Sequence, residues 1–125
     1  MTTPASRLAP CPRKRNCVSS LAPPGRRHME PIPYAGSQEE ARRRLLAVLG
    51  AWPHTRIVAD EPDYLHAECR SAVFRFVDDV EFAFDGGARL IHFRSASRLG
   101  SFDWGVNRKR MEAIRGKFLT TGAGP

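Results

Sequence analysis

The sequence lacks any long hydrophobic run. No window of its 125 residues approaches the ~20 apolar residues of a transmembrane helix. The N-terminus has no apolar stretch of the kind that forms a secretory signal, and Met1 is followed by Thr2 instead of the glycine that myristoylation requires. For the chain as written, these absences predict a cytoplasmic protein without a transmembrane segment. A true start upstream of Met1 would instead allow export or attachment to a membrane.

The sequence also lacks the residue spacings that hold metals and nucleotide cofactors. Its four histidines, at positions 28, 54, 66 and 92, include no His-x-x-x-His pair. Its glycines match neither the phosphate-binding loop of nucleotide hydrolases nor the dinucleotide fingerprint. No nucleophile-elbow pattern supports a serine hydrolase. We therefore expect no metal and no other cofactor.

Acidic residues are missing from the first 28 positions, which nevertheless contain six lysines and arginines. This segment accounts for +6 of the net charge of +7, so residues 29–125 are nearly neutral. A protein that binds the phosphate backbone of nucleic acid is expected to carry its positive charge on the folded domain. The distribution therefore disfavours nucleic acid as a partner. A small anionic molecule or another protein is the expected partner.

Composition divides the chain into three parts. Residues 1–36 contain seven of the ten prolines, which predicts an extended basic arm. Residues 37–119 are predicted to form a single α+β domain, and residues 120–125 a flexible tail. Within the arm, Cys11 and Cys17 have two possible states: a small disulfide loop in an oxidising compartment, or free thiols in the cytosol.

The first predicted helix has a clear start and a single apolar stripe. Ser37 and Glu40 form a capping box. Apolar residues then recur at helical spacing, at Ala41, Leu45, Val48 and Leu49. Gly50 and Pro53 are typical of a helix end.

Alternation with a period of two follows this helix. It predicts strands over residues 56–60, 64–71, 74–84 and 89–96, with Gly86 and Gly87 in the last turn suited to a positive φ. Cys69 falls on the apolar side of its strand and is expected in the core.

A second helix is predicted from Asp103 to about Leu119. Its buried side is expected at Val106, Met111, Ile114 and Phe118. The order helix, four strands, helix predicts a two-layer α+β sandwich. In it, a mainly antiparallel four-stranded sheet has both helices on one face.

Asp78 interrupts the apolar face of the strand predicted over residues 74–84. An unpaired carboxylate is costly there. One explanation is structural: a bulge at Asp78–Asp79 that turns the side chains outward, or an ion pair. The other is functional, with Asp78 held beneath Arg94 or Arg98 in a ligand site. Asp78 or Asp79 is then a candidate general base, because neighbouring carboxylates raise one pKa.

A second candidate cluster follows the last predicted strand. Arg94, Ser95, Ser97 and Arg98 lead through a glycine turn to Asn107 and Arg108 at the start of a helix, an arrangement that suits an anion. The alternative is that the two arginines pair across the sheet with Glu68, Asp79 or Glu81, and that Asn107 caps the helix.

Five motifs together resemble the family catalogued as domain of unknown function 1499. They are CP with NCVSS (residues 11–12 and 16–20), YLHAE (64–68), RFVDDVEF (75–82), RSASR (94–98) and GVNRKR (105–110). The resemblance covers residues 11–119 and implies no established activity, although some relatives look exported or membrane-attached. The chain departs from the pattern in its basic residues 13–15 and in Cys69.

Two functional hypotheses follow. The first is a binding module that holds a small anionic ligand or a protein partner. Its candidate residues are Arg75, Asp78, Asp79, Arg94, Ser95, Ser97, Arg98, Asn107 and Arg108. The second is a hydrolase- or lyase-type enzyme with Asp78 or Asp79 as general base. A purely structural role is a further alternative.

Overall fold

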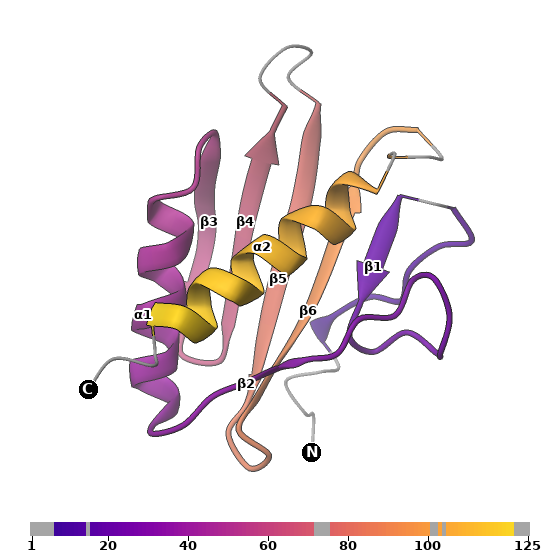
Figure 1. Cartoon of the computed structure of the whole chain (residues 1–125). Helices are drawn as coiled ribbons and strands as arrows, with labels where there is room; N and C mark the ends of the chain where they lie inside the picture. The colour runs from indigo at the N-terminus through magenta and orange to yellow at the C-terminus, as the bar shows by residue number, and fades with distance from the viewer. Residues whose placement is uncertain (1–6, 15, 72–75, 101–102, 104, 122–125) are drawn as a thin grey trace.

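The computed structural model describes residues 7–14, 16–71, 76–100, 103 and 105–121. These residues fold as an antiparallel sheet with two helices on one face, which confirms the α+β class (Figure 1). The elements in chain order are β1 (Cys17–Ser19), β2 (Ile32–Pro33), α1 (Gln38–Gly50), β3 (Thr55–Glu61), β4 (Tyr64–Arg70), β5 (Val77–Asp85), β6 (Leu90–Ser97) and α2 (Val106–Thr121). No helix in this part of the chain is long and apolar enough to cross a membrane.

Among the described residues the sheet has six strands, whereas the sequence predicted four. Its order is β1-β6-β5-β4-β3, and β2 also pairs with β6. The two additional strands come from the proline-rich segment, and they occupy successive stretches of one edge of β6. Proline is tolerated at a sheet edge because its missing N–H is not needed there. At these points the predicted extended arm is instead part of the sheet.

Helix α1 forms as its local sequence predicts. The Ser37 hydroxyl accepts a hydrogen bond from the Glu40 N–H at 3.1 Å, which caps the first turn. The whole predicted stripe is buried against the sheet: Ala41, Leu45, Val48 and Leu49.

Strand β5 supplies the centre of the core. Val80, Phe82 and Phe84 are fully buried on the face toward the helices. The strand begins at Val77 and not at the predicted residue 74; residues 72–75 lie outside the described residues, and Phe76 is 54% exposed. Its pairing with β4 and β6 is regular, so the bulge predicted at Asp78–Asp79 is wrong; the irregularity is in β3, between Ile57 and Ala59.

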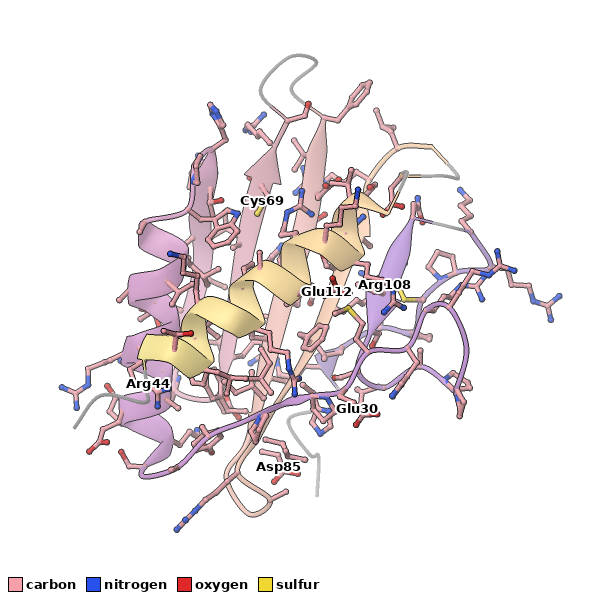
Figure 2. The ribbon with its side chains drawn as sticks, in the orientation of Figure 1. Glu30, Arg44, Cys69, Asp85, Arg108 and Glu112 are labelled. Atoms are coloured by element: carbon pink, nitrogen blue, oxygen red, sulfur yellow. A yellow bond between two sulfur atoms is a disulfide. The ribbon has the colours of Figure 1, made fainter. Side chains whose placement is uncertain are left out.

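Two further details differ from the expectation. The buried stripe of α2 consists of Asn107, Met111, Ile114 and Phe118, whereas the predicted Val106 is 45% exposed. In the turn between β5 and β6, the positive φ belongs to Arg89 (55°), and neither Gly86 nor Gly87 adopts one. Cys69 is buried in the core as expected, and Figure 2 shows it on β4.

Candidate functional site

Asp78 is held in an ion pair between the sheet and α2. It lies on the helix side of β5 and is 8% exposed. Its carboxylate accepts a hydrogen bond from the Arg110 guanidinium of α2 at 2.7 Å. The ion-pair explanation of this buried charge is therefore confirmed, and the partner is Arg110 and neither Arg94 nor Arg98.

Asn107 connects this pair to three other segments. It is fully buried, and its Oδ1 accepts hydrogen bonds from the Ser95 hydroxyl at 2.6 Å and from Arg110 at 2.9 Å. Its Nδ2 has two hydrogens and lies within hydrogen-bond distance of three acceptors: the Ser97 hydroxyl, the Asp103 carboxylate and the backbone carbonyl of Asn16. Buried polar groups of this kind are stable when every member has a partner. The network therefore joins β6, α2 and the N-terminal segment.

A second polar network lies on the opposite face of the sheet and contains Asp79. The Asp79 carboxylate accepts hydrogen bonds from Arg98 Nε at 2.7 Å and from His66 Nε2 at 2.8 Å. Arg98 also donates to Glu68 at 2.5 Å. The hydrogen bond from Arg98, with a smaller contribution from His66, lowers the pKa of the Asp79 carboxyl.

Arg94 lies on this same face and pairs with Glu81 at 3.6 Å. Glu81 also accepts a hydrogen bond from the Tyr64 hydroxyl, and burial together with this carboxylate raises the pKa of Tyr64. Leu8 packs on Tyr64, and the Arg7 guanidinium lies 4.0 Å from its ring centroid. Arg94 and Arg98 therefore pair across the sheet with Glu68, Asp79 and Glu81, as the alternative to an anion site predicted.

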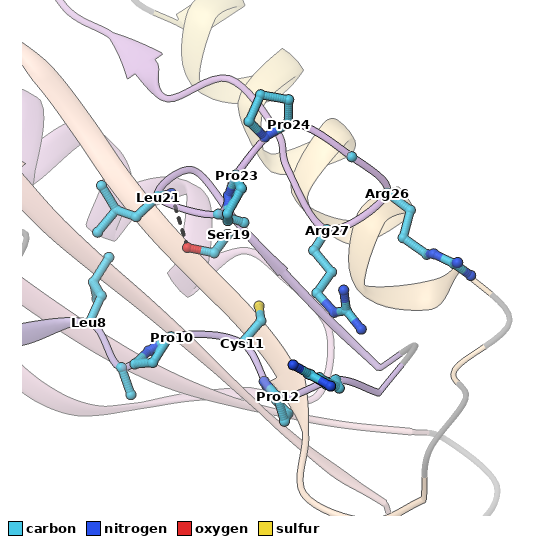
Figure 3. Close-up of a pocket in the computed structure, with 14 residues that line it drawn as sticks. Leu8, Pro10, Cys11, Pro12, Ser19, Leu21, Pro23, Pro24, Arg26 and Arg27 are labelled. Carbon is cyan, nitrogen blue, oxygen red and sulfur yellow. Dashed lines mark hydrogen bonds between the residues drawn. The ribbon is translucent and has the colours of Figure 1, made fainter.

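The N-terminal segment is closed by a disulfide between Cys11 and Cys17, with an S–S distance of 2.09 Å. Two adjacent hollows flank it. The first, which we call the proline cleft, has a volume of about 310 Å³. Figure 3 shows Pro10, Cys11 and Pro12 on one of its walls and Pro23, Pro24, Arg26 and Arg27 on the other.

The second hollow, which we call the arginine cleft, has a volume of about 230 Å³ and lies between the N-terminal segment and the start of α2. Arg26 and Arg27 line both clefts, and the arginine cleft also contains Arg108 and Asp103. Figure 2 shows Arg108 extending from α2 toward the N-terminal segment.

The arginines of these clefts donate hydrogen bonds to neutral groups. Arg27 Nε donates to the carbonyl of Lys14 at 3.2 Å, and Arg108 donates to the carbonyls of Arg26 and His28. A carbonyl partner leaves the guanidinium charge uncompensated. Asp103 is the only acidic residue among the described residues that line either cleft, and its carboxylate caps α2 through the N–H groups of Gly105 and Asn107.

A protein-family model described as "Protein of unknown function (DUF1499)" matches residues 7–118. The chain belongs to this family. The match confirms the resemblance that the five sequence motifs predicted. No curated protein and no solved structure matches the chain.

In this DUF1499 domain, the residues predicted as one cluster are divided between the two faces of the sheet. The helix side holds Asp78, Ser95, Ser97 and Asn107. The opposite face holds Asp79, Arg94 and Arg98. Arg108 lines the arginine cleft, and Arg75 lies outside the described residues.

Sequence reasoning predicted Arg108 of the arginine cleft but missed Arg26 and Arg27, which line both clefts of the DUF1499 domain. Their signal was the acid-free, basic composition of residues 1–28, which was assigned to an arm outside the folded domain. It also missed Arg110, although this residue ends the GVNRKR motif. The described residues contain no group of His, Cys, Asp and Glu side chains that could hold a metal ion.

Proposed function

We propose that this domain is a binding module for a small anionic ligand, which it takes up at the arginines shared by the proline cleft and the arginine cleft. The observation that carries the proposal is that Arg26 and Arg27 line both clefts. A guanidinium presents a planar fork of N–H donors that fits a carboxylate or phosphate. A ligand at the junction of the clefts therefore meets two such forks.

The local charge supports an anion over a neutral ligand. Arg13, Arg26 and Arg27 line the proline cleft, and Arg108 joins Arg26 and Arg27 in the arginine cleft. Asp103 is the only acidic residue among the described residues of either lining, so the field around the clefts is positive. Two of the arginines, Arg27 and Arg108, already donate to backbone carbonyls, which fixes part of each side chain. Pre-ordered side chains lose less conformational entropy when a ligand binds.

The contacts of Asp78 and Asp79 argue against the alternative of an enzyme with one of them as general base. Asp78 is paired with Arg110 and is only 8% exposed. Asp79 is paired with Arg98, and its lowered pKa makes the carboxylate a weaker base.

Calorimetric titration and thermal unfolding with inorganic phosphate and pyrophosphate test the proposal. Chloride should replace them at equal ionic strength in the reference samples, because exposed charges are screened by any salt. Pyrophosphate at ten times its Kd should stabilise the folded domain by about 1.4 kcal/mol. The double variant Arg26→Ala/Arg27→Ala should lose this stabilisation.

Arg43→Ala is the matched control, because Arg43 is an exposed arginine on α1, away from both clefts. It should keep the response of the wild type. Equal loss in the control and the double variant would show a general charge effect and would contradict a specific site. Absence of any response to phosphate and pyrophosphate in the wild type would contradict the proposal itself.

A further inference from the structure

The proline cleft has largely apolar walls, which distinguishes it from a simple phosphate site. Four prolines line it, together with Leu21, whose side chain is 43% exposed. The prolines lie on two walls, Pro10 and Pro12 on one and Pro23 and Pro24 on the other (Figure 3). Ligand sites commonly combine apolar walls with a few polar groups that fix orientation.

Prolines and a disulfide restrict the conformations that these walls can adopt. A proline side chain has no rotamer freedom to lose on burial. One wall is fixed further by the disulfide from Cys11 to Cys17, and Cys17 pairs with Ala96 of β6. A preformed apolar cleft binds an apolar group at a lower entropic cost than a mobile loop does.

The polar groups lie at defined places in this cleft. Arg13, Arg26 and Arg27 contribute the positive charge. Ser19 also lines the cleft and is 2% exposed. Its hydroxyl oxygen accepts a hydrogen bond from the Leu21 N–H at 3.1 Å, and its own proton is donated to no acceptor among the described residues. Ser19 therefore offers one buried donor to a polar atom of a ligand.

The volume limits the size of the occupant. A buried cavity of about 150 Å³ accommodates benzene. The proline cleft, at about 310 Å³, has room for one or two rings. From its walls, charge and volume, we infer that the ligand is an amphipathic anion: an aromatic body of one or two rings in the proline cleft, with a phosphate or carboxylate at Arg26 and Arg27. This inference rests on the proposed function and names the class of its ligand.

Fluorescence anisotropy with 1-naphthyl phosphate tests the inference, with inorganic phosphate as competitor. Burial of the rings should make 1-naphthyl phosphate bind at least about tenfold more tightly than inorganic phosphate. Uncharged 1-naphthol should bind more weakly than either anion. The double variant Arg26→Ala/Arg27→Ala should bind neither 1-naphthyl phosphate nor inorganic phosphate.

A pair of matched leucine variants isolates the apolar contact. Leu21→Ser should weaken the binding of 1-naphthyl phosphate about tenfold and leave the affinity for inorganic phosphate unchanged. Leu119→Ser should change neither, because Leu119 is similarly exposed (38%) but lies near the end of α2.

Three results would overturn the inference. Equal affinity for 1-naphthyl phosphate and inorganic phosphate would show that the rings are not bound, and it would leave the proposed function intact. If neither anion binds, the inference and the proposed function are both overturned. Binding that persists in the double arginine variant and is lost in Trp52→Ala would assign the rings to a different hollow, of about 400 Å³, between the ends of α1 and α2.

Discussion

Asp78 and Arg110 form an ion pair that joins β5 to α2, with side chains only 11% and 12% exposed and an N–O distance of 2.7 Å. Removing one member of a buried pair leaves the other charge without a partner, which typically costs about 3–5 kcal/mol. We therefore expect Asp78→Val and Arg110→Met each to lower the free energy of unfolding by about 3 kcal/mol, measured by urea denaturation.

The double variant Asp78→Val/Arg110→Met should be more stable than either single variant, because no buried charge is left unpaired. The exposed pair between Arg7 and Glu61 gives the control, with side chains 40% and 47% exposed. Glu61→Gln should cost less than about 1 kcal/mol. If the double variant loses as much as the two single variants together, the two residues act independently and the coupling is refuted.

The pKa of Asp79 makes the acid stability of the domain depend on this residue. Arg98 and His66 lower the pKa of its carboxyl below the ordinary value of 3.8, so the folded state takes up the proton less readily than the unfolded state. Asp79 therefore contributes stability above pH 3.8. This contribution is lost as the pH falls through the lowered pKa.

Urea denaturation between pH 7 and pH 2 checks this dependence. Asp79→Asn should be less stable than the wild type at pH 7, and the difference should shrink below about pH 4. Arg98→Met should show the same narrowing, because it removes the main cause of the shift. A difference that stays constant over the whole range would assign the effect to packing and not to the carboxylate charge.

Asn107 should contribute more to stability than its exposed neighbour on α2. It is fully buried and hydrogen bonded to Ser95, Ser97, Asp103, Asn16 and Arg110. Asn107→Ala leaves several of these partners buried and unpaired, so we expect a loss of about 3 kcal/mol in thermal or urea unfolding. Val106→Ala, at a position 45% exposed, should cost less than about 0.5 kcal/mol. Similar losses for the two variants would contradict the assigned burial.

Elements with strong local signals were predictable from the sequence. The capping box at Ser37 and the stripe through Leu45 define α1 without reference to any other segment, because both are set by residues within one or two helical turns. The buried face of α2 was only partly predicted. The prediction chose Val106 for the buried face, whereas its neighbour Asn107 is buried. Burial of a polar Asn is favourable only because it has hydrogen-bond partners in β6 and the N-terminal segment, which are distant in sequence.

Long-range pairing was beyond the sequence. Nothing near Asp78 indicates Arg110 as its partner, because 32 residues separate them and helix–sheet docking brings them together. The strands β1 and β2 were missed for a related reason. Seven prolines argue against regular structure locally, whereas the free edge of β6 can pair with short strands beside them. The prediction therefore placed the basic segment outside the folded domain, although its arginines line two clefts of that domain.

The disulfide gives a prediction that separates the two clefts. Cys11 lines the proline cleft and is attached to the sheet through its bond to Cys17. Cys17 lines the arginine cleft and is held independently, because it pairs with Ala96 and the preceding Asn16 carbonyl accepts from the Ser97 N–H at 2.9 Å. Reduction should therefore release one wall of the proline cleft and leave the arginine cleft in place.

Cys11→Ser, or reduction by a dithiol that is itself oxidised to a disulfide, should lower the free energy of unfolding by about 2 kcal/mol, as expected for so short a loop. In the same samples, affinity for 1-naphthyl phosphate should fall to that for inorganic phosphate, whose own affinity should not change. Cys69→Ala is the control for the remaining thiol. In this variant, reduction should change the affinities for both ligands as it does in the wild type. Loss of inorganic phosphate binding on reduction would show that the two clefts depend on one another and would contradict this prediction.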